Sequence, residues 1–285
     1  MTREQEVDLD PDAQNILREW RELIVEHYAS DIERLSPLSD PVCGFEIEYD
    51  LLQTKEALRM AFHETPLRVL EFGTRVMLEQ FQHHNVRMRP VLRIVRFPRH
   101  FIRRVDELRM RDRNTVVCLD VKVNDVSHPY GWLKTAVYQC DDCGGRVDLP
   151  QRRARERVSP NFCFPCFEEA MEGRDKDDPL PRRLFRDMTD FSMVLEECRY
   201  EDIQDLSLSQ ITTNDQHHVL HCSPSNQIVG TVADDLVGEI EASTYIRVNG
   251  IVRVQPIPDR TFAKDTRRLL SLDVLSVEPL SVSEG

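Results

Sequence analysis

The sequence predicts an α+β protein, in which a helical N-terminal region precedes a small antiparallel β-barrel that an insertion interrupts. Apolar residues recur at helical spacing over the first ninety residues. After Pro90 the pattern changes to short segments rich in β-branched residues, which Pro, Gly, Asn and Asp separate. Two C-x-x-C pairs stand among these segments. With 285 residues, the chain is long enough for two domains of roughly 150 residues each.

The N-terminal region is expected to be a helical bundle with one short strand. Asp10 can cap a helix and Pro11 suits the first helical position, so a helix is predicted through the apolar stripe Ile16–Leu35. A strand, a short helix and a long amphipathic helix that Thr65 caps are predicted next, over Gly44–Asp50, Thr54–Phe62 and Pro66–Phe81. The apolar stripes are expected to form a core rather than a binding face.

Seven segments that follow Pro90 predict strands, because each is short and rich in β-branched residues. The predicted strands are Thr115–Val123, Leu133–Tyr138, Asp190–Leu195, Leu206–Ile211, Ile228–Val232, Tyr245–Val254 and Leu269–Val277. Their close spacing favours a small antiparallel barrel over βαβ units.

The net charge of −13, from 37 Lys and Arg against 50 Asp and Glu, argues at first against a polyanionic partner. The basic residues are 5 Lys and 32 Arg, and an acidic surface poor in Lys is expected of a protein that works in concentrated salt. The positive charge is also clustered, since ten Arg lie between Arg87 and Arg113 against three acidic residues. We expect ion pairs from this segment, within the chain or to a neighbouring subunit, with DNA phosphate as the alternative.

Four of the eight cysteines form a pattern typical of a structural zinc site. Cys140 and Cys143 are followed, after 19 intervening residues, by Cys163 and Cys166. Each C-x-x-C turn brings two sulfurs to one ion, and two such turns complete a tetrahedron with Zn–S bonds of about 2.3 Å. One structural Zn²⁺ per chain is therefore predicted. Two redox dithiols or disulfides are the alternative, which the lack of a secretory signal disfavours.

Other motifs that carry chemistry are missing from the sequence. The run His217–Cys222 is rich in metal-binding residue types but has no recognised ligand spacing, so a polar loop is favoured. There is no nucleophile elbow, no H-E-x-x-H, no G-x-G-x-x-G and no G-x-x-x-x-G-K-[ST]. An enzyme is therefore the least expected class. No apolar run reaches the roughly 20 residues of a membrane-spanning helix, so no membrane partner is expected.

Three segments of the sequence carry a family resemblance. Phe45–Leu52 (FEIEYDLL) forms a strand pattern and a helix start, and Tyr138–Asp148 (YQCDDCGGRVD) surrounds the first cysteine pair. Ile228–Arg253 is the most specific segment, because it contains a strand, the motif DDLV and the motif G-I-x-R. In this order, the three segments resemble the N-terminal region of the MCM replicative helicases of archaea and eukaryotes. Asp205–Gln210 and Thr212–Asn226 depart from that family, since the first has no basic residue and the second has no G-G-x-x-P-R motif.

The resemblance implies a helical subdomain over residues 1–92, an oligonucleotide-binding (OB) barrel over 93–139 and 182–285, and a zinc-ribbon insertion over 140–181. It also implies a hairpin that projects from the barrel near 253–270. In the family, this region forms a hexameric ring whose channel holds DNA, the zinc ribbons help two rings to meet, and a separate AAA+ motor domain follows. The expected protein is therefore an archaeal, halophilic, cytoplasmic and nucleoid-associated DNA-binding module without that motor.

The projecting hairpin carries the residues that are expected to contact DNA phosphates without sequence preference. The predicted contacts are Arg253, Arg260, Lys264, Arg267 and Arg268, with Lys122 and Lys134 as weaker candidates on barrel segments. A solvated hairpin whose charges pair locally is the alternative. Because the whole chain is acidic, several subunits must pool their basic residues, and a lone subunit is expected to bind weakly.

The expected partners are single- or double-stranded DNA, further copies of the chain in a hexamer or double hexamer, and other replication proteins. Two other functions fit the same sequence. One is a motorless relative that acts as a protein-interaction or regulatory partner of a helicase ring. The other is an unrelated zinc-ribbon protein of transcription or translation.

Overall fold

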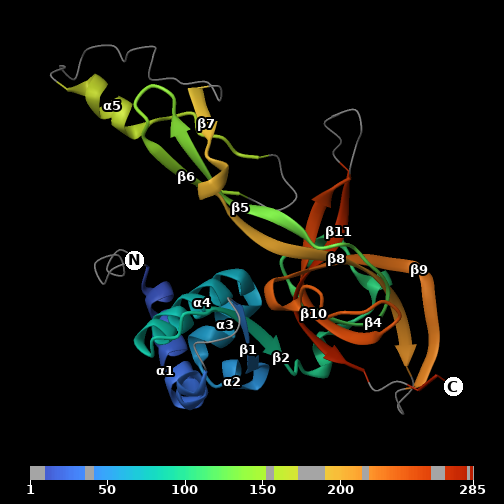
Figure 1. The fold of residues 1–285 in the computed structure, drawn as a ribbon. Coiled ribbons are helices and arrows are strands. Elements are labelled where there is room, and N and C mark those ends of the chain that lie inside the picture. The colour runs from blue at the N-terminus through green and yellow to red at the C-terminus, as the bar shows by residue number, and fades with distance from the viewer. Residues whose placement is uncertain are drawn as a thin grey trace. The chain divides into compact units, whose positions relative to one another are not determined.

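The computed structural model describes residues 10–35, 42–151, 157–172, 190–213, 218–257, 267–280 and 283–284. The chain forms two compact units, which are Met1–Pro129 together with Ile203–Gly285, and Tyr130–Asp202. The first unit contains the helical region and the barrel, and the second contains the four cysteines of the predicted zinc site (Figure 1). The α+β class that the sequence predicts is confirmed.

Four helices pack around a two-stranded sheet in the N-terminal region. The helices are α1 (Pro11–Arg34), α2 (Tyr49–Gln53), α3 (Glu56–Glu64) and α4 (Pro66–His83). The strands β1 (Val42–Glu48) and β2 (Arg89–Val95) run parallel. Their shared core is fully buried and includes Trp20, Phe62 and Phe81.

The two predicted helix caps have different outcomes. The Asp10 carboxylate accepts a hydrogen bond from the Ala13 N–H at 2.7 Å, which confirms the cap of α1. The Thr65 side chain does not cap α4, because its hydroxyl donates to the Ala61 carbonyl of the preceding helix at 3.3 Å instead. Pro66 still begins α4, where its missing N–H costs nothing.

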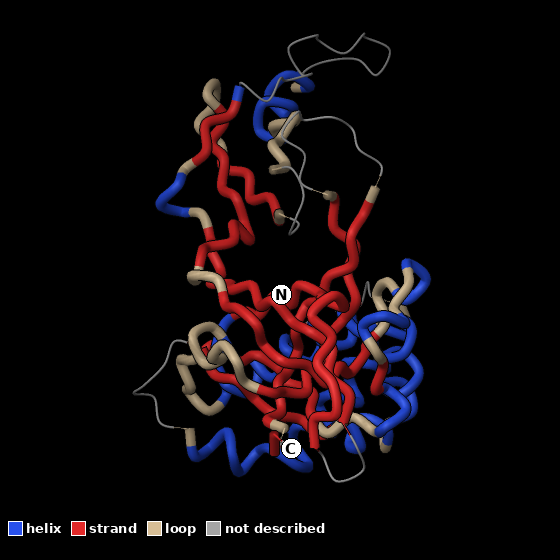
Figure 2. Tube along the Cα trace, turned by 90° about the vertical axis from the view of Figure 1, so that its right-hand side faces the viewer, coloured by secondary structure: helices blue, strands red, loops and turns tan. Residues whose placement is uncertain are grey.

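Five strands, of which β8 begins in the second unit and the others belong to the first, close into a barrel (Figure 2). They are β4 (Val116–Val126), β8 (Arg199–Thr213), β9 (His218–Ala233), β10 (Tyr245–Pro256) and β11 (Arg268–Pro279). The order around the barrel is β4–β8–β9–β11–β10 and back to β4. Four pairings are antiparallel, and β9 runs parallel to β11, which the sequence pattern did not predict. This order, with one parallel pair, is that of a five-stranded OB barrel.

The barrel interior is filled by residues that alternate along the strands, among them Leu119, Val121, Leu208, Val248 and Leu272, all with 0 % exposure. Two short strands add to the barrel, since β3 (Ile102–Arg103) pairs with β4 and β12 (Ser283–Glu284) pairs with β9. Single 3-10 turns join the strands at η2 (Arg99–Phe101), η3 (Val105–Glu107), η4 (Met110–Asp112) and η8 (Asp234–Leu236).

The second unit is a small sheet with one helix. In it β5 (Tyr130–Cys140) pairs antiparallel with β6 (Arg146–Pro150) and with β7 (Phe191–Met193). The helix α5 (Phe164–Met171) and the turn η7 (Leu195–Glu197) complete the unit. Tyr138, Cys140, Cys163 and Phe191 form its buried core, so two of the predicted metal ligands are also core residues.

A buried arginine joins the helical region to the barrel. Arg93 lies on β2 with only 7 % of its side chain exposed, and it forms an ion pair with Asp235 of η8. Its Nη2 donates to the Ala233 carbonyl at 2.8 Å, and its Nη1 donates to the Leu275 carbonyl at 3.0 Å. Every guanidinium nitrogen therefore has a partner, which is the condition under which a charge can be buried.

Further polar contacts continue this junction along β11. The Ser276 hydroxyl donates to the Ile94 carbonyl of β2, and the Asn249 amide donates to Ser276 at 3.0 Å and to Glu278 at 2.6 Å. The approach is close, because a Cβ added to Gly44 of β1 would overlap the Asp235 carboxylate. We refer to Arg93, Asp235, Asn249, Ser276 and Glu278 as the polar seam.

Replacement of Arg93 by Met should destabilise the first unit by roughly 3 kcal/mol, because it leaves a partly buried carboxylate without its cation. Arg96→Met is the matched control on the same segment. Arg96 pairs with Glu48, but 71 % of its side chain is exposed, so its loss should cost less than about 1 kcal/mol. Urea denaturation followed by circular dichroism measures both changes, and equal losses would contradict the role of the seam.

Candidate metal centre and basic surfaces

The fold brings the four predicted cysteine ligands together. Cys140 is the last residue of β5 and Cys143 lies in the turn before β6, while Cys163 precedes α5 and Cys166 lies in its first turn. All four Sγ atoms lie within 4.8 Å of one another. The Cys140 and Cys166 sulfurs are 3.8 Å apart, and those of Cys143 and Cys163 are 3.4 Å apart. Zn–S bonds of about 2.3 Å in a tetrahedron require sulfur pairs about 3.8 Å apart, so the cluster fits this ion.

The turn after Cys140 prepares one of these sulfurs for metal binding. Gly144 has a φ of 70°, a conformation that glycine adopts without strain, and its N–H donates to the Cys140 carbonyl at 2.9 Å. The N–H of Gly145 donates to the Cys143 sulfur at 3.3 Å. This hydrogen bond, followed by that of Cys163, lowers the pKa of Cys143 to about 7, which favours the thiolate form that binds a metal.

The alternative of two disulfides does not fit this geometry. No cysteine forms a disulfide in the structure, and the sulfur separations of 3.4 and 3.8 Å within the cluster far exceed the S–S bond of about 2.05 Å. Cys118 is a core residue, as predicted, and burial raises the pKa of its thiol to about 12. The prediction of a polar loop over His217–Cys222 is wrong for His218–Cys222, which belongs to strand β9 and pairs with β8. His217 and the side chains from His218 to His221 lie outside the described residues.

Three of the predicted DNA contacts lie at one end of the barrel. In the antiparallel pair β10–β11, Pro256 stands opposite Arg268 and Arg253 stands opposite Ser271, so these arms form the base of the predicted hairpin. Arg267 and Arg268 are exposed, and the Arg268 guanidinium donates to the Arg267 carbonyl at 2.7 Å. Arg260 and Lys264 lie outside the described residues.

Arg253 is already engaged within the barrel. Its Nε donates to the Asp273 carboxylate at 2.6 Å and its Nη1 donates to the Asn114 side chain at 3.2 Å. Only 28 % of its side chain is exposed. Local charge pairing, the alternative weighed for the hairpin, therefore applies to Arg253.

The two predicted lysines lie elsewhere. Lys122 of β4 stands opposite Tyr245 of β10, and its Nζ lies 5.4 Å from the centre of the tyrosine ring. Tyr245 and Arg253 are eight residues apart on one strand, or about 26 Å at 3.3 Å per residue, so Lys122 and the hairpin base occupy opposite ends of the barrel. Lys134 belongs to the second unit, where it pairs with Glu201 at 2.5 Å.

Half of the arginines in the arginine-rich segment are paired with acidic residues that the structure describes. Arg89, Arg93, Arg96, Arg103 and Arg104 pair with Asp234, Asp235, Glu48, Glu107 and Asp106. This agrees with the ion pairs expected from the segment. Arg111 and Arg113 differ, because both are exposed and neither has an acidic partner among the described residues.

The chain belongs to the class of α+β proteins with a closed five-stranded barrel in OB order. A helical region precedes the barrel, and a four-cysteine unit is inserted between its first two strands. The chain has the fold of a solved structure described as the N-terminal domain of an archaeal MCM. The TM-score is 0.69 at 18 % sequence identity, over 94 % of this chain and 99 % of the other. No protein-family model and no curated protein matches the sequence. Among the described residues, no helix is long and apolar enough to cross a membrane.

The metal prediction can be tested by elemental analysis of the purified protein. We expect about one zinc per chain, and Cys143→Ser should abolish it. Without zinc, this small unit should lose several kcal/mol of its free energy of unfolding. Its melting temperature should therefore fall by at least about 10 °C. Cys222→Ser, in the first unit, is the control and should leave zinc content unchanged. Zinc-free protein with an unaltered melting curve would contradict a structural zinc site.

Proposed function

We propose that this chain is the DNA-binding and ring-forming module of an MCM-type replicative helicase. The main support for this proposal is the closed barrel in OB order with an inserted four-cysteine unit. The fold is similar to that of an archaeal MCM N-terminal domain over 94 % of this chain. The motifs DDLV and G-I-x-R, on which the family resemblance rests, fall on η8 and β10 of that barrel. One zinc ion, held by Cys140, Cys143, Cys163 and Cys166, would stabilise the inserted unit.

Under this proposal, DNA binding depends on pooled charge. Arg267 and Arg268 are exposed at the base of the hairpin, and Arg260 and Lys264 belong to the part of the sequence between β10 and β11 that lies outside the described residues. A ring of chains would place these residues around one channel, where phosphate contacts release counterions regardless of DNA sequence. ATP hydrolysis is not assigned to these 285 residues, since they contain no phosphate-binding loop. We further expect association with the nucleoid and adaptation to concentrated salt.

A regulatory partner of a helicase ring is the second candidate. The pairing of Arg253 with Asp273 and of Lys134 with Glu201 favours it, because both cations are partly satisfied without DNA. This candidate predicts that the chain binds a helicase ring and does not retain DNA in any state of assembly.

The hairpin assignment is tested by Arg267→Ala combined with Arg268→Ala. The double variant should bind single-stranded DNA roughly tenfold more weakly at moderate salt and show a shallower dependence of log K on log salt, because each lost phosphate contact removes counterion release. The matched control is Arg18→Ala with Arg59→Ala, two exposed arginines on α1 and α3. Fluorescence anisotropy with a labelled oligonucleotide measures the affinity for DNA and its salt dependence. Equal affinities for the two double variants would contradict the assignment of the hairpin as a DNA contact.

A further inference from the structure

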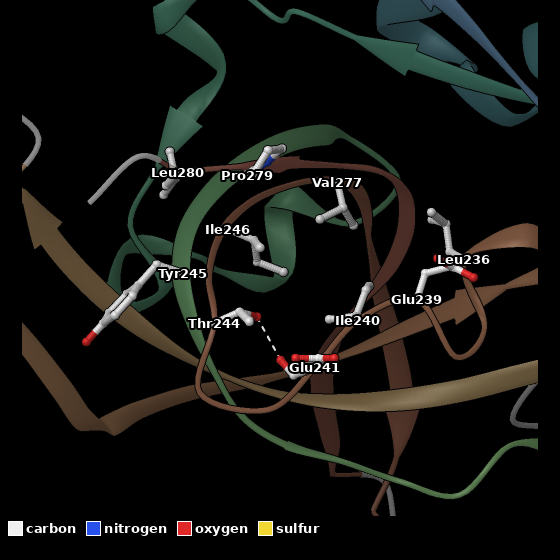
Figure 3. A pocket seen from close by; sticks show the side chains of 10 residues that line it. All are labelled: Leu236, Glu239, Ile240, Glu241, Thr244, Tyr245, Ile246, Val277, Pro279 and Leu280. Carbon is white, nitrogen blue, oxygen red and sulfur yellow. Dashed lines mark hydrogen bonds between the residues drawn. The ribbon is translucent and has the colours of Figure 1, made fainter. Parts of the chain in front are cut away.

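An apolar pocket of about 590 Å³ opens at the end of the barrel where β10 begins. Leu236, Ile240, Ile246 and Val277 contribute to its walls. Figure 3 shows the side chains of Ile240, Ile246 and Val277 pointing toward a common space. Leu236, Ile240 and Val277 are only half-buried, so this apolar surface remains open to a partner.

The rim of this pocket is acidic. Glu239 and Glu241 line it and are exposed, and neither carboxylate has a cationic partner among the described residues. An apolar site with two uncompensated carboxylates selects a partner segment that carries an apolar side chain between positive charges.

The chain itself presents such a segment at η4. Met110 is 42 % exposed, and Arg109, Arg111 and Arg113 around it are exposed as well. Arg111 and Arg113 lack an acidic partner in the described part of the chain, as do Arg87, Arg99 and Arg109 of the same basic segment. An exposed apolar residue between unpaired cations is thus the chemical complement of the pocket.

The η4 segment is held in one conformation. The Arg109 N–H donates to the Asp112 carboxylate at 2.7 Å, and the Thr115 hydroxyl donates to the Asp112 carbonyl at 2.6 Å. Arg109 Nη1 donates to the carbonyls of Asp106 and Leu108, both at 2.8 Å, and Leu108 is buried beneath the turn. Docking would therefore require little further ordering of the backbone, which lowers its entropic cost.

The segment and the pocket lie at opposite ends of the same two strands. Asn114, next to η4, donates to the Val252 carbonyl near the end of β10, whereas Thr244, which lines the pocket, accepts from Val123 near the far end of β4. Thr244 and Val252 are eight positions apart along the chain, a span of about 26 Å in an extended strand. One copy cannot fill its own pocket, so the contact would be head-to-tail, the type that closes into rings.

We propose that η4 of one copy docks into the pocket of the next, with Met110 in the apolar cavity and Arg111 and Arg113 facing Glu239 and Glu241. This contact rests on the proposed ring-forming function and names the surfaces that build the ring.

A charge exchange tests the contact. One variant carries Arg111→Glu and Arg113→Glu, and a second carries Glu239→Arg and Glu241→Arg. Each variant alone opposes like charges and should sediment as a monomer at low salt. An equimolar mixture restores opposite charges at every contact and should recover the mass of the wild-type assembly. Misfolded chains would not recover in this way. Arg18→Glu with Arg59→Glu matches the charge change of the first variant and should assemble normally.

The outcomes separate this contact from the proposed function. If the wild type assembles and each variant alone assembles equally well, the contact is wrong while ring formation stands. The same holds if the first variant keeps its mass but loses DNA binding, because Arg111 and Arg113 would then contact phosphate. If the wild type is a monomer at all concentrations and salts, with and without DNA, the ring and the contact are both overturned. Met110→Glu, on an exposed side chain, should also weaken assembly without lowering the melting temperature.

Discussion

The buried ion pair between Arg93 and Asp235 is the interaction on which the arrangement of the first unit depends. It joins two positions 142 residues apart and fixes η8 against the helical region. The chain leaves η8 through Leu236 and continues into the acidic rim, so the same pair sets the position of the proposed docking pocket. Because Arg93 also binds carbonyls of β9 and β11, removing Asp235 alone would leave a buried cation without a counter-charge.

The two ends of the barrel differ in what they can bind. One end of the barrel carries the hairpin base with Arg267 and Arg268, and η4 with the exposed Arg111 and Arg113 joins β10 toward the same end. At the other, Lys122 and Tyr245 stand near an acidic, apolar pocket. The net charge of −13 is therefore an average over the whole chain, whereas the barrel has a basic end and an acidic end. That polarity suits head-to-tail assembly, in which each copy covers the acidic end of the next.

Much of this organisation could be predicted from local patterns. The cap at Asp10, the C-x-x-C pairs and the strands β4, β5, β10 and β11 follow from patterns over a few residues, and each lies close to where the sequence predicts it. The strands β8 and β9 are much longer than predicted, and β2 and β6 were not predicted. The prediction that Thr65 caps α4 was wrong, because its hydroxyl donates to a carbonyl of the preceding helix instead. The parallel β9–β11 pairing, the Arg93–Asp235 pair and the pocket depend on contacts between distant segments, which periodicity does not encode. Arg93 was visible only as one of ten clustered arginines, and Glu239 and Glu241 had no sequence signal.

The central claim is that DNA is held by an assembly and not by a single chain. Sedimentation velocity with a labelled single-stranded oligonucleotide, recorded at separate wavelengths for protein and DNA, measures how many chains accompany each DNA molecule. We expect DNA to sediment only with a species of several chains, and dilution to the monomer to release it. A tight complex of one chain with one DNA molecule would contradict the account.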